Sequence, residues 1–131
     1  MSESATIRKR LGVGVAAGVL ATLVALALLF SATAEAASPN LVATVGPGYT
    51  ISLKTASGKR VTTLTRGTYT IVVKDRSDDH NFYVRGPGVS KAFTGVEFVG
   101  TKTIKVRLGS GRYGFVCTPH SDEMHGSFSV R

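Results

Sequence analysis

Residues 113–128 read YGFVCTPHSDEMHGSF and contain the only cysteine of the 131-residue chain, Cys117, together with His120, His125 and Met124. Thiolate, imidazole and thioether groups suit Cu(I) and still hold Cu(II), and a cysteine with two histidines and a weak axial methionine is a recognised copper ligand set. The spacing C-x2-H-x3-M supplies one cysteine, one histidine and the methionine. A second, distant histidine is needed, and only His80 is left to supply it. We therefore predict a metal site shared between this segment and His80.

The sequence on either side of this segment has the pattern of short β-strands separated by glycine turns. Residues 49–54 and 101–108 alternate between apolar and polar, which is typical of half-buried strands, and Tyr49 should share the buried face of the first run. No helical pattern follows residue 36. We expect an all-β sandwich of about seven or eight strands. The expected strands are 41–45 at a sheet edge, 49–54, 61–64, 68–74, 80–85, 101–108, 112–117 and 126–130, with 89–100 unassigned.

The expected sandwich explains how distant donors can meet. The loop at 75–79 and the loop at 117–124 can lie at the same end of the two sheets, which brings His80 to Cys117 across 37 positions. Pro119 restricts Thr118 to extended geometry, so we expect a loop that folds its donors inward. A rigid sheet would then fix the site, and a copper site that changes shape little between its two oxidation states favours electron transfer.

The first 36 residues have the pattern of an export signal. The basic cluster Arg8-Lys9-Arg10 precedes the uncharged run 11–30, and Ala34-Glu35-Ala36 places small residues where a signal peptidase reads. We predict a signal peptide at 1–36 and a mature domain at 37–131 outside the cytoplasm; an uncleaved membrane anchor helix is the alternative. One cysteine forms no internal disulfide, so its presence in an exported domain favours a metal thiolate.

The net charge of +8 predicts an acidic redox partner or an anionic membrane surface. Nucleic acid is not expected, because the basic residues are scattered singly rather than gathered in a stripe with stacked aromatics. Asp122 and Glu123 are better interpreted as solvated loop residues than as an acid–base pair, so we do not expect an enzyme.

The motifs together resemble the single-domain blue copper proteins, the cupredoxins of the plastocyanin and azurin type. The resemblance rests on DRSDDHNF at 75–82, GPG at 86–88, YGFVCTPH at 113–120 and MHGSF at 124–128, and it covers about 41–131. It implies a Greek-key β-sandwich holding one type 1 copper ion. The implied ligands are His80, Cys117, His120 and Met124. Asn81 is implied to hydrogen-bond across to the ligand loop.

The resemblance also implies a function. A one-electron carrier is the leading hypothesis, with the edge of His120 near the surface as the electron port; an extracytoplasmic copper buffer or delivery protein is the alternative. An oxidase or nitrite-reducing role would need a second copper centre, for which three histidines are too few. Plastocyanin-like loops have four residues before the methionine, where this chain has three.

Four alternatives remain open at this stage. His80 can be a strand histidine satisfied by Asp78 or Asp79. Met124 can fill a core gap, the commoner role of methionine. His125 is interpreted as a bystander or alternative ligand, because adjacent residues of a strand face opposite ways. Zn(II) also accepts a cysteine and two histidines, although a thioether fourth ligand disfavours it.

Overall fold

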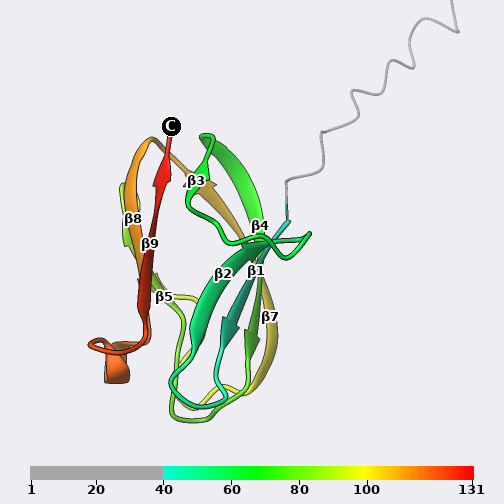
Figure 1. The fold of residues 1–131 in the computed structure, drawn as a ribbon, viewed down its shortest axis with the longest axis vertical. Coiled ribbons are helices and arrows are strands. Elements are labelled where there is room, and N and C mark those ends of the chain that lie inside the picture. Colours follow the sequence, from blue (N-terminus) through cyan, green and yellow to red (C-terminus); the bar gives the residue numbers. More distant parts are fainter. Residues whose placement is uncertain (1–39) are drawn as a thin grey trace, which may run out of the picture. The chain divides into compact units, whose positions relative to one another are not determined.

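The structure is a computed structural model that describes residues 40–131. The export signal or anchor helix expected at 1–36 lies outside the described residues. The described chain forms nine strands and one 3-10 turn (Figure 1). They are β1 (Asn40–Val45), β2 (Ile51–Thr55), β3 (Thr63–Leu64), β4 (Gly67–Asp75), β5 (Tyr83–Gly86), β6 (Val89–Ala92), β7 (Gly100–Leu108), β8 (Gly111–Val116), η1 (Thr118–His120) and β9 (His125–Val130).

The strands form two sheets that enclose one apolar core, so the expectation of an all-β sandwich is confirmed. One sheet has the order β2-β1-β4-β7 and the other the order β3-β9-β8-β5-β6. Period-two alternation buries one face of each sheet, as in β1, where Leu41, Ala43 and Val45 are almost fully buried. The second sheet contributes stacked aromatic pairs, Tyr113 with Phe128 and Phe82 with Phe115.

The expected edge position of residues 41–45 is wrong. β1 is an interior strand, antiparallel to β2 and parallel to β4. The parallel pairing with β4 joins segments about 30 residues apart, and no local sequence pattern predicts such a pairing. The edge strands of this sheet are β2 and β7 instead. On β7, Thr101, Lys102 and Arg107 are exposed, and lysines on an edge strand discourage pairing with other chains.

Two further boundaries differ from the sequence expectation. The unassigned stretch at 89–100 contains β6, which pairs with β5 as a short hairpin. The strand expected at 80–85 begins only at Tyr83. Its first residues leave the ladder because the backbone N–H of Phe82 donates to the hydroxyl of Thr94. His80 therefore sits in the loop that leads into β5.

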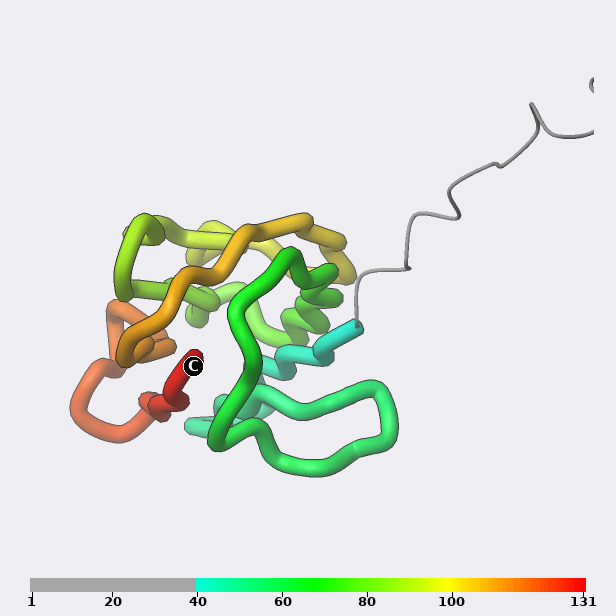
Figure 2. The backbone as a smooth tube through the Cα atoms, turned by 90° about the horizontal axis from the view of Figure 1, so that it is seen from above, coloured from blue at the N-terminus to red at the C-terminus, as the bar shows by residue number. Residues whose placement is uncertain are grey.

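The C-terminal end of the described chain is anchored in the second sheet. Figure 2 shows the C-terminal end of β9 beside the segment that carries β3, and β3 pairs with β9 in parallel through Thr63 and Leu64. The backbone N–H of Arg66 donates to the carbonyl of Arg131 at 2.8 Å. No helix within residues 40–131 is long and apolar enough to cross a membrane.

Candidate metal centre

The donors meet beside the segment 117–124, which follows β8 at one end of the sandwich (Figure 1). Cys117 follows the last residue of β8 in extended geometry, and the next three residues form the single 3-10 turn η1. Thr118 is thus the first residue of a turn, not the extended residue expected before Pro119. The turn is possible because proline is tolerated at the start of a helix, where its missing N–H is not needed.

Backbone hydrogen bonds close the segment at its base. The N–H of Cys117 donates to the carbonyl of Met124 at 2.9 Å, and the N–H of Met124 donates to the carbonyl of His120 at 2.8 Å. The first bond continues the pairing of β8 with β9, so the two strands hold both ends of the segment. As a result the position of His120 relative to Cys117 is set by the sheet.

Three donor atoms form a compact triangle. Nδ1 of His80 and Nδ1 of His120 are 3.0 Å apart, and Sγ of Cys117 is 3.7 Å from each of them. The centre of such a triangle lies about 2.0 Å from every corner, which matches metal–imidazole bonds of about 2.0–2.1 Å and falls slightly short of metal–thiolate bonds of about 2.3 Å. One metal ion could therefore be held by all three donors. The residues therefore fit a first-row metal ion.

His80 is oriented for this role by its other ring nitrogen. Nε2 lies 2.9 Å from the carbonyl oxygen of Gly48, in the turn between β1 and β2. A carbonyl only accepts, so Nε2 carries the proton and Nδ1 presents its lone pair toward Cys117. This is the usual arrangement in which a backbone carbonyl fixes the tautomer of a metal-binding histidine. Asp79 Oδ1 is also 3.5 Å from Nε2, but Asp79 is mostly exposed.

Asn81 ties the two donor segments together. Its Oδ1 accepts the backbone N–H of Thr118 at 2.8 Å and the Thr118 hydroxyl at 3.2 Å. Asn81 is buried and follows His80, while Thr118 follows Cys117, so these bonds fix the separation of the two ligand-bearing residues. Removing such a contact around a metal site typically costs 10- to 100-fold in metal affinity.

Tyr49 is a part of the site that the sequence analysis misplaced. It was expected to share a buried face with Ile51, but it precedes β2 and its side chain is 62% exposed. Its ring centroid is 5.0 Å from that of His120 in an edge-on arrangement and 6.0 Å from that of His80. Tyr49 therefore covers the outer side of both imidazoles. The only sequence signal was its place directly after the glycine turn at 46–48.

The two remaining candidate ligands lie in different surroundings. Met124 is fully buried and belongs to the core cluster that also contains Cys117. His125 is exposed, and its Nδ1 is 3.0 Å from the carbonyl oxygen of Ser121. The donor group that the described residues bring together consists of His80, Cys117 and His120, without His125.

A buried polar chain supports the segment that carries His80. The hydroxyl of Thr94 accepts the N–H of Phe82 at 2.9 Å and donates to Oδ2 of Asp75 at 2.7 Å. Burial raises the pKa of the Asp75 carboxyl above its ordinary value, and the hydrogen bond from Thr94 opposes that rise. Thr94 lies in the stretch the sequence left unassigned, where no pattern revealed its role.

Replacing Thr94 with valine should destabilise the protein by about 1–3 kcal/mol at neutral pH, because a buried N–H and a buried carboxylate lose their partner. The pKa of Asp75 should rise further. A raised folded-state pKa costs stability above that pKa and costs nothing below the unfolded value, so the deficit should shrink at acid pH. Urea unfolding at neutral and at acid pH measures the free energy of unfolding of the variant. Thr94→Ser, which keeps the hydroxyl, is the control. Equal stability of the two variants would contradict the prediction.

Comparison with solved structures identifies the fold. A structure of rusticyanin from Thiobacillus ferrooxidans and a structure of rusticyanin variants each match with a TM-score of 0.50 at 22% identity. The alignments cover 70% of this chain and 76% of the rusticyanin chain. This chain has the cupredoxin fold. Rusticyanin itself is a copper protein. The expected resemblance is confirmed at the level of the cupredoxin fold.

The sequence alone matches no family model and no curated protein. At this level of identity the likeness concerns the backbone fold. The identity of the bound metal depends on the donor atoms of this chain.

Proposed function

We propose that this protein is a copper-binding electron carrier with ligands His80, Cys117 and His120 and with Met124 as the axial ligand. The observation that carries the proposal is the donor triangle, whose centre lies about 2.0 Å from one sulfur and two imidazole nitrogens. Copper bound there supplies a one-electron couple between Cu(I) and Cu(II).

Copper is favoured over zinc by the burial and chemistry of the donors. A structural zinc site takes four histidine, cysteine or carboxylate ligands, and the described donor group contains three such residues. Met124 is the other buried residue of the segment 117–124 beside Cys117, and its thioether suits copper. Asp122 and Glu123 stand on the same segment but are exposed.

The surroundings of the donors favour electron transfer over storage. The carbonyl of Gly48 fixes the ring of His80, and Oδ1 of Asn81 fixes the backbone of Thr118. The backbone N–H of Cys117 donates to the carbonyl of Met124 at the other end of the same segment. Ligands whose positions are fixed by the surrounding protein move little when the charge of the metal changes. The reorganisation energy of electron transfer is therefore small. His120 is the least buried of the three donors, and we propose its ring as the point of electron exit.

The optical spectrum tests the proposal directly. The protein loaded with Cu(II) should show an intense visible thiolate-to-copper band, and cyclic voltammetry should show a fast, reversible one-electron couple. A copper buffer would hold Cu(I) with no accessible couple. The absence of the visible band, or preference for zinc in metal analysis of the exported form, would overturn the proposal.

The proposal also includes export from the cytoplasm and a negatively charged partner. A carrier outside the cytoplasm needs an export signal, and residues 1–36 have that pattern. A chain of net charge +8 favours a negatively charged partner, either an acidic redox protein or an anionic membrane surface. We propose no catalytic turnover. Fractionation of the cells that make the protein, with N-terminal sequencing of the mature form, tests both export and cleavage.

A further inference from the structure

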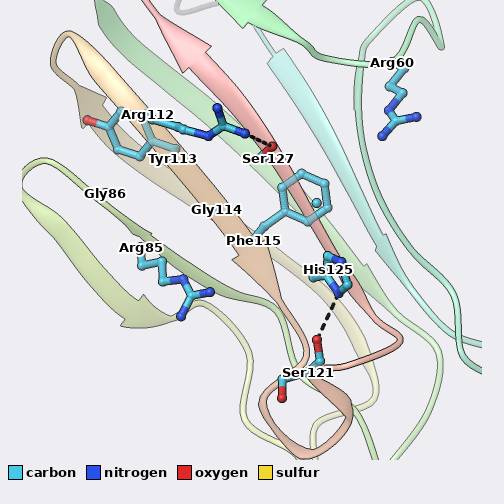
Figure 3. A pocket seen from close by; sticks show the side chains of 11 residues that line it. Arg60, Arg85, Gly86, Arg112, Tyr113, Gly114, Phe115, Ser121, His125 and Ser127 are labelled. Carbon is cyan, nitrogen blue, oxygen red and sulfur yellow. Dashed lines mark hydrogen bonds between the residues drawn. The ribbon is translucent and has the colours of Figure 1, made fainter.

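A hollow on the described surface lies beside the metal centre rather than at it. It has a volume of about 930 Å³ and is formed over β5, β8 and β9 and the segment 117–124 (Figure 3). Its lining contains three arginines and a histidine and no acidic residue: Arg60, Arg85, Gly86, Arg112, Tyr113, Gly114, Phe115, Ser121, His125, Gly126 and Ser127. We call this hollow the arginine groove.

The register of the strands places the polar residues of the groove on one face. Arg85 of β5 is directly opposite Gly114 of β8, and Gly114 is directly opposite Ser127 of β9. Residues opposite one another across a sheet point to the same side. The neighbours Tyr113 and Phe115 alternate with Gly114 and are buried on the other side. Arg85, and Arg112 two residues before Gly114, therefore stand on the outer face of this sheet, and Arg60 reaches the groove from the loop after β2.

Gly114 gives the groove its floor. A Cβ atom at this position would be in van der Waals contact with Nε of Arg85, at 3.4 Å, so the Arg85 side chain lies over the strand at Gly114. Figure 3 shows Arg85 and Arg112 on either side of Gly114. Two guanidinium groups are thus presented around a stretch of bare backbone, where a ligand chain can approach closely.

These cations are not neutralised within the described chain. None of Arg60, Arg85 and Arg112 makes an ion pair with residues 40–131, and Nη2 of Arg112 donates to the hydroxyl of Ser127 at 3.4 Å. Guanidinium groups make strong paired hydrogen bonds to carboxylates and phosphates. The groove therefore offers unused donors to an anion.

The basic lining extends beyond the arginine groove into a second hollow, so one bound chain can contact both. A second hollow of about 250 Å³ shares Arg60, Phe115 and His125 with it and adds Lys54 of β2, again with no acidic residue. The basic residues thus continue from the outer face of β8 around β9 to the other sheet. A flat membrane surface would reach the exposed arginines on one face but could not follow this bend.

We propose that the arginine groove binds an acidic peptide segment of a partner protein, with carboxylates paired to Arg85 and Arg112. This groove would be the binding site of the acidic partner in the proposed function. The proposal rests on the proposed function only in assuming that a redox partner docks. Ser121 and His125 join the groove to the segment that carries His120, so a partner bound here would lie next to the metal centre.

Binding of a fluorescent ten-residue peptide of alternating glutamate and glycine tests the proposal, measured by anisotropy with metal-free and copper-loaded protein. The double variant Arg85→Gln with Arg112→Gln should weaken binding by about tenfold, since two charged hydrogen-bond donors are lost. The matched control is Lys102→Gln with Arg107→Gln, which removes the same charge from exposed positions on β7 of the other sheet. The control should change binding less than about threefold.

The outcomes separate the possible sources of negative charge. Equal losses in the two double variants would show attraction to net charge alone and would overturn the proposal. So would binding of anionic lipid vesicles without peptide binding, or displacement of the peptide by inorganic phosphate at equal concentration. Because the peptide assay works without copper, its result is independent of whether the visible copper band is found.

Discussion

Replacing Cys117 with serine should abolish the intense visible absorption of the copper-loaded protein and lower its copper affinity by more than about 100-fold. Cys117 supplies the only sulfur anion of the described chain, and its Sγ is 3.7 Å from each histidine donor. A hydroxyl is not deprotonated at neutral pH and is a harder donor that suits copper poorly. Loss of a ligand should also exceed the 10- to 100-fold cost of losing a supporting contact.

The measurement is a copper titration followed by visible and electron paramagnetic resonance spectra. Serine at this fully buried position would also introduce a hydroxyl that has no hydrogen-bond partner. Cys117→Ala is therefore a second variant, which removes the thiolate without adding a polar group. Urea unfolding of the metal-free variants shows that the sandwich is intact. Survival of the visible band in either folded variant would remove Cys117 from the ligand set and, with it, the proposed function.

The sequence was most informative where chemistry and strand period are local. The donors His80, Cys117 and His120 could be proposed because their types and spacing are unusual for a chain with one cysteine. Strands such as β4 and β7 were recognisable because alternation and β-branched residues mark a half-buried strand.

What the sequence did not reveal depends on contacts between distant segments. The interior position of β1 follows from its pairing with β4, and that pairing carries the glycine turn at 46–48 to the site. Gly48 then contributes a carbonyl, which any residue type can supply, so no side-chain pattern could point to it. Thr94 was hidden in the same way, because its role is one hydroxyl placed between Phe82 and Asp75.

Tyr49 shows a different limit. The alternation that made Ile51 and Leu53 recognisable also suggested a buried Tyr49, since a period of two predicts a shared face for every second residue. The pattern fails at its first member because β2 begins only at Ile51. Beyond the end of a strand, the direction of a side chain is set by the turn, and here the turn places the ring against two imidazoles.

Replacing Met124 with leucine should raise the reduction potential of the bound copper and change its visible spectrum. Met124 is fully buried, and its backbone bonds to Cys117 and His120 close the segment 117–124. Leucine conserves volume and these backbone bonds, so the structural cost should stay below about 1.5 kcal/mol. Only the thioether is lost. A weak axial donor stabilises Cu(II) more than Cu(I), so its removal favours the reduced state.

The matched control is His125→Ala, which removes a better ligand type from the adjacent position. Its Nδ1 is committed to the carbonyl of Ser121, and it lies outside the group formed by His80, Cys117 and His120. We therefore expect its spectrum and potential to remain those of the unchanged protein, measured by cyclic voltammetry and visible absorption. If His125→Ala shifts the potential and Met124→Leu does not, the assignment of the fourth ligand must be reversed. The burial of Met124 would then reflect core packing alone, since a methionine in that role is exchangeable for leucine without effect on the metal.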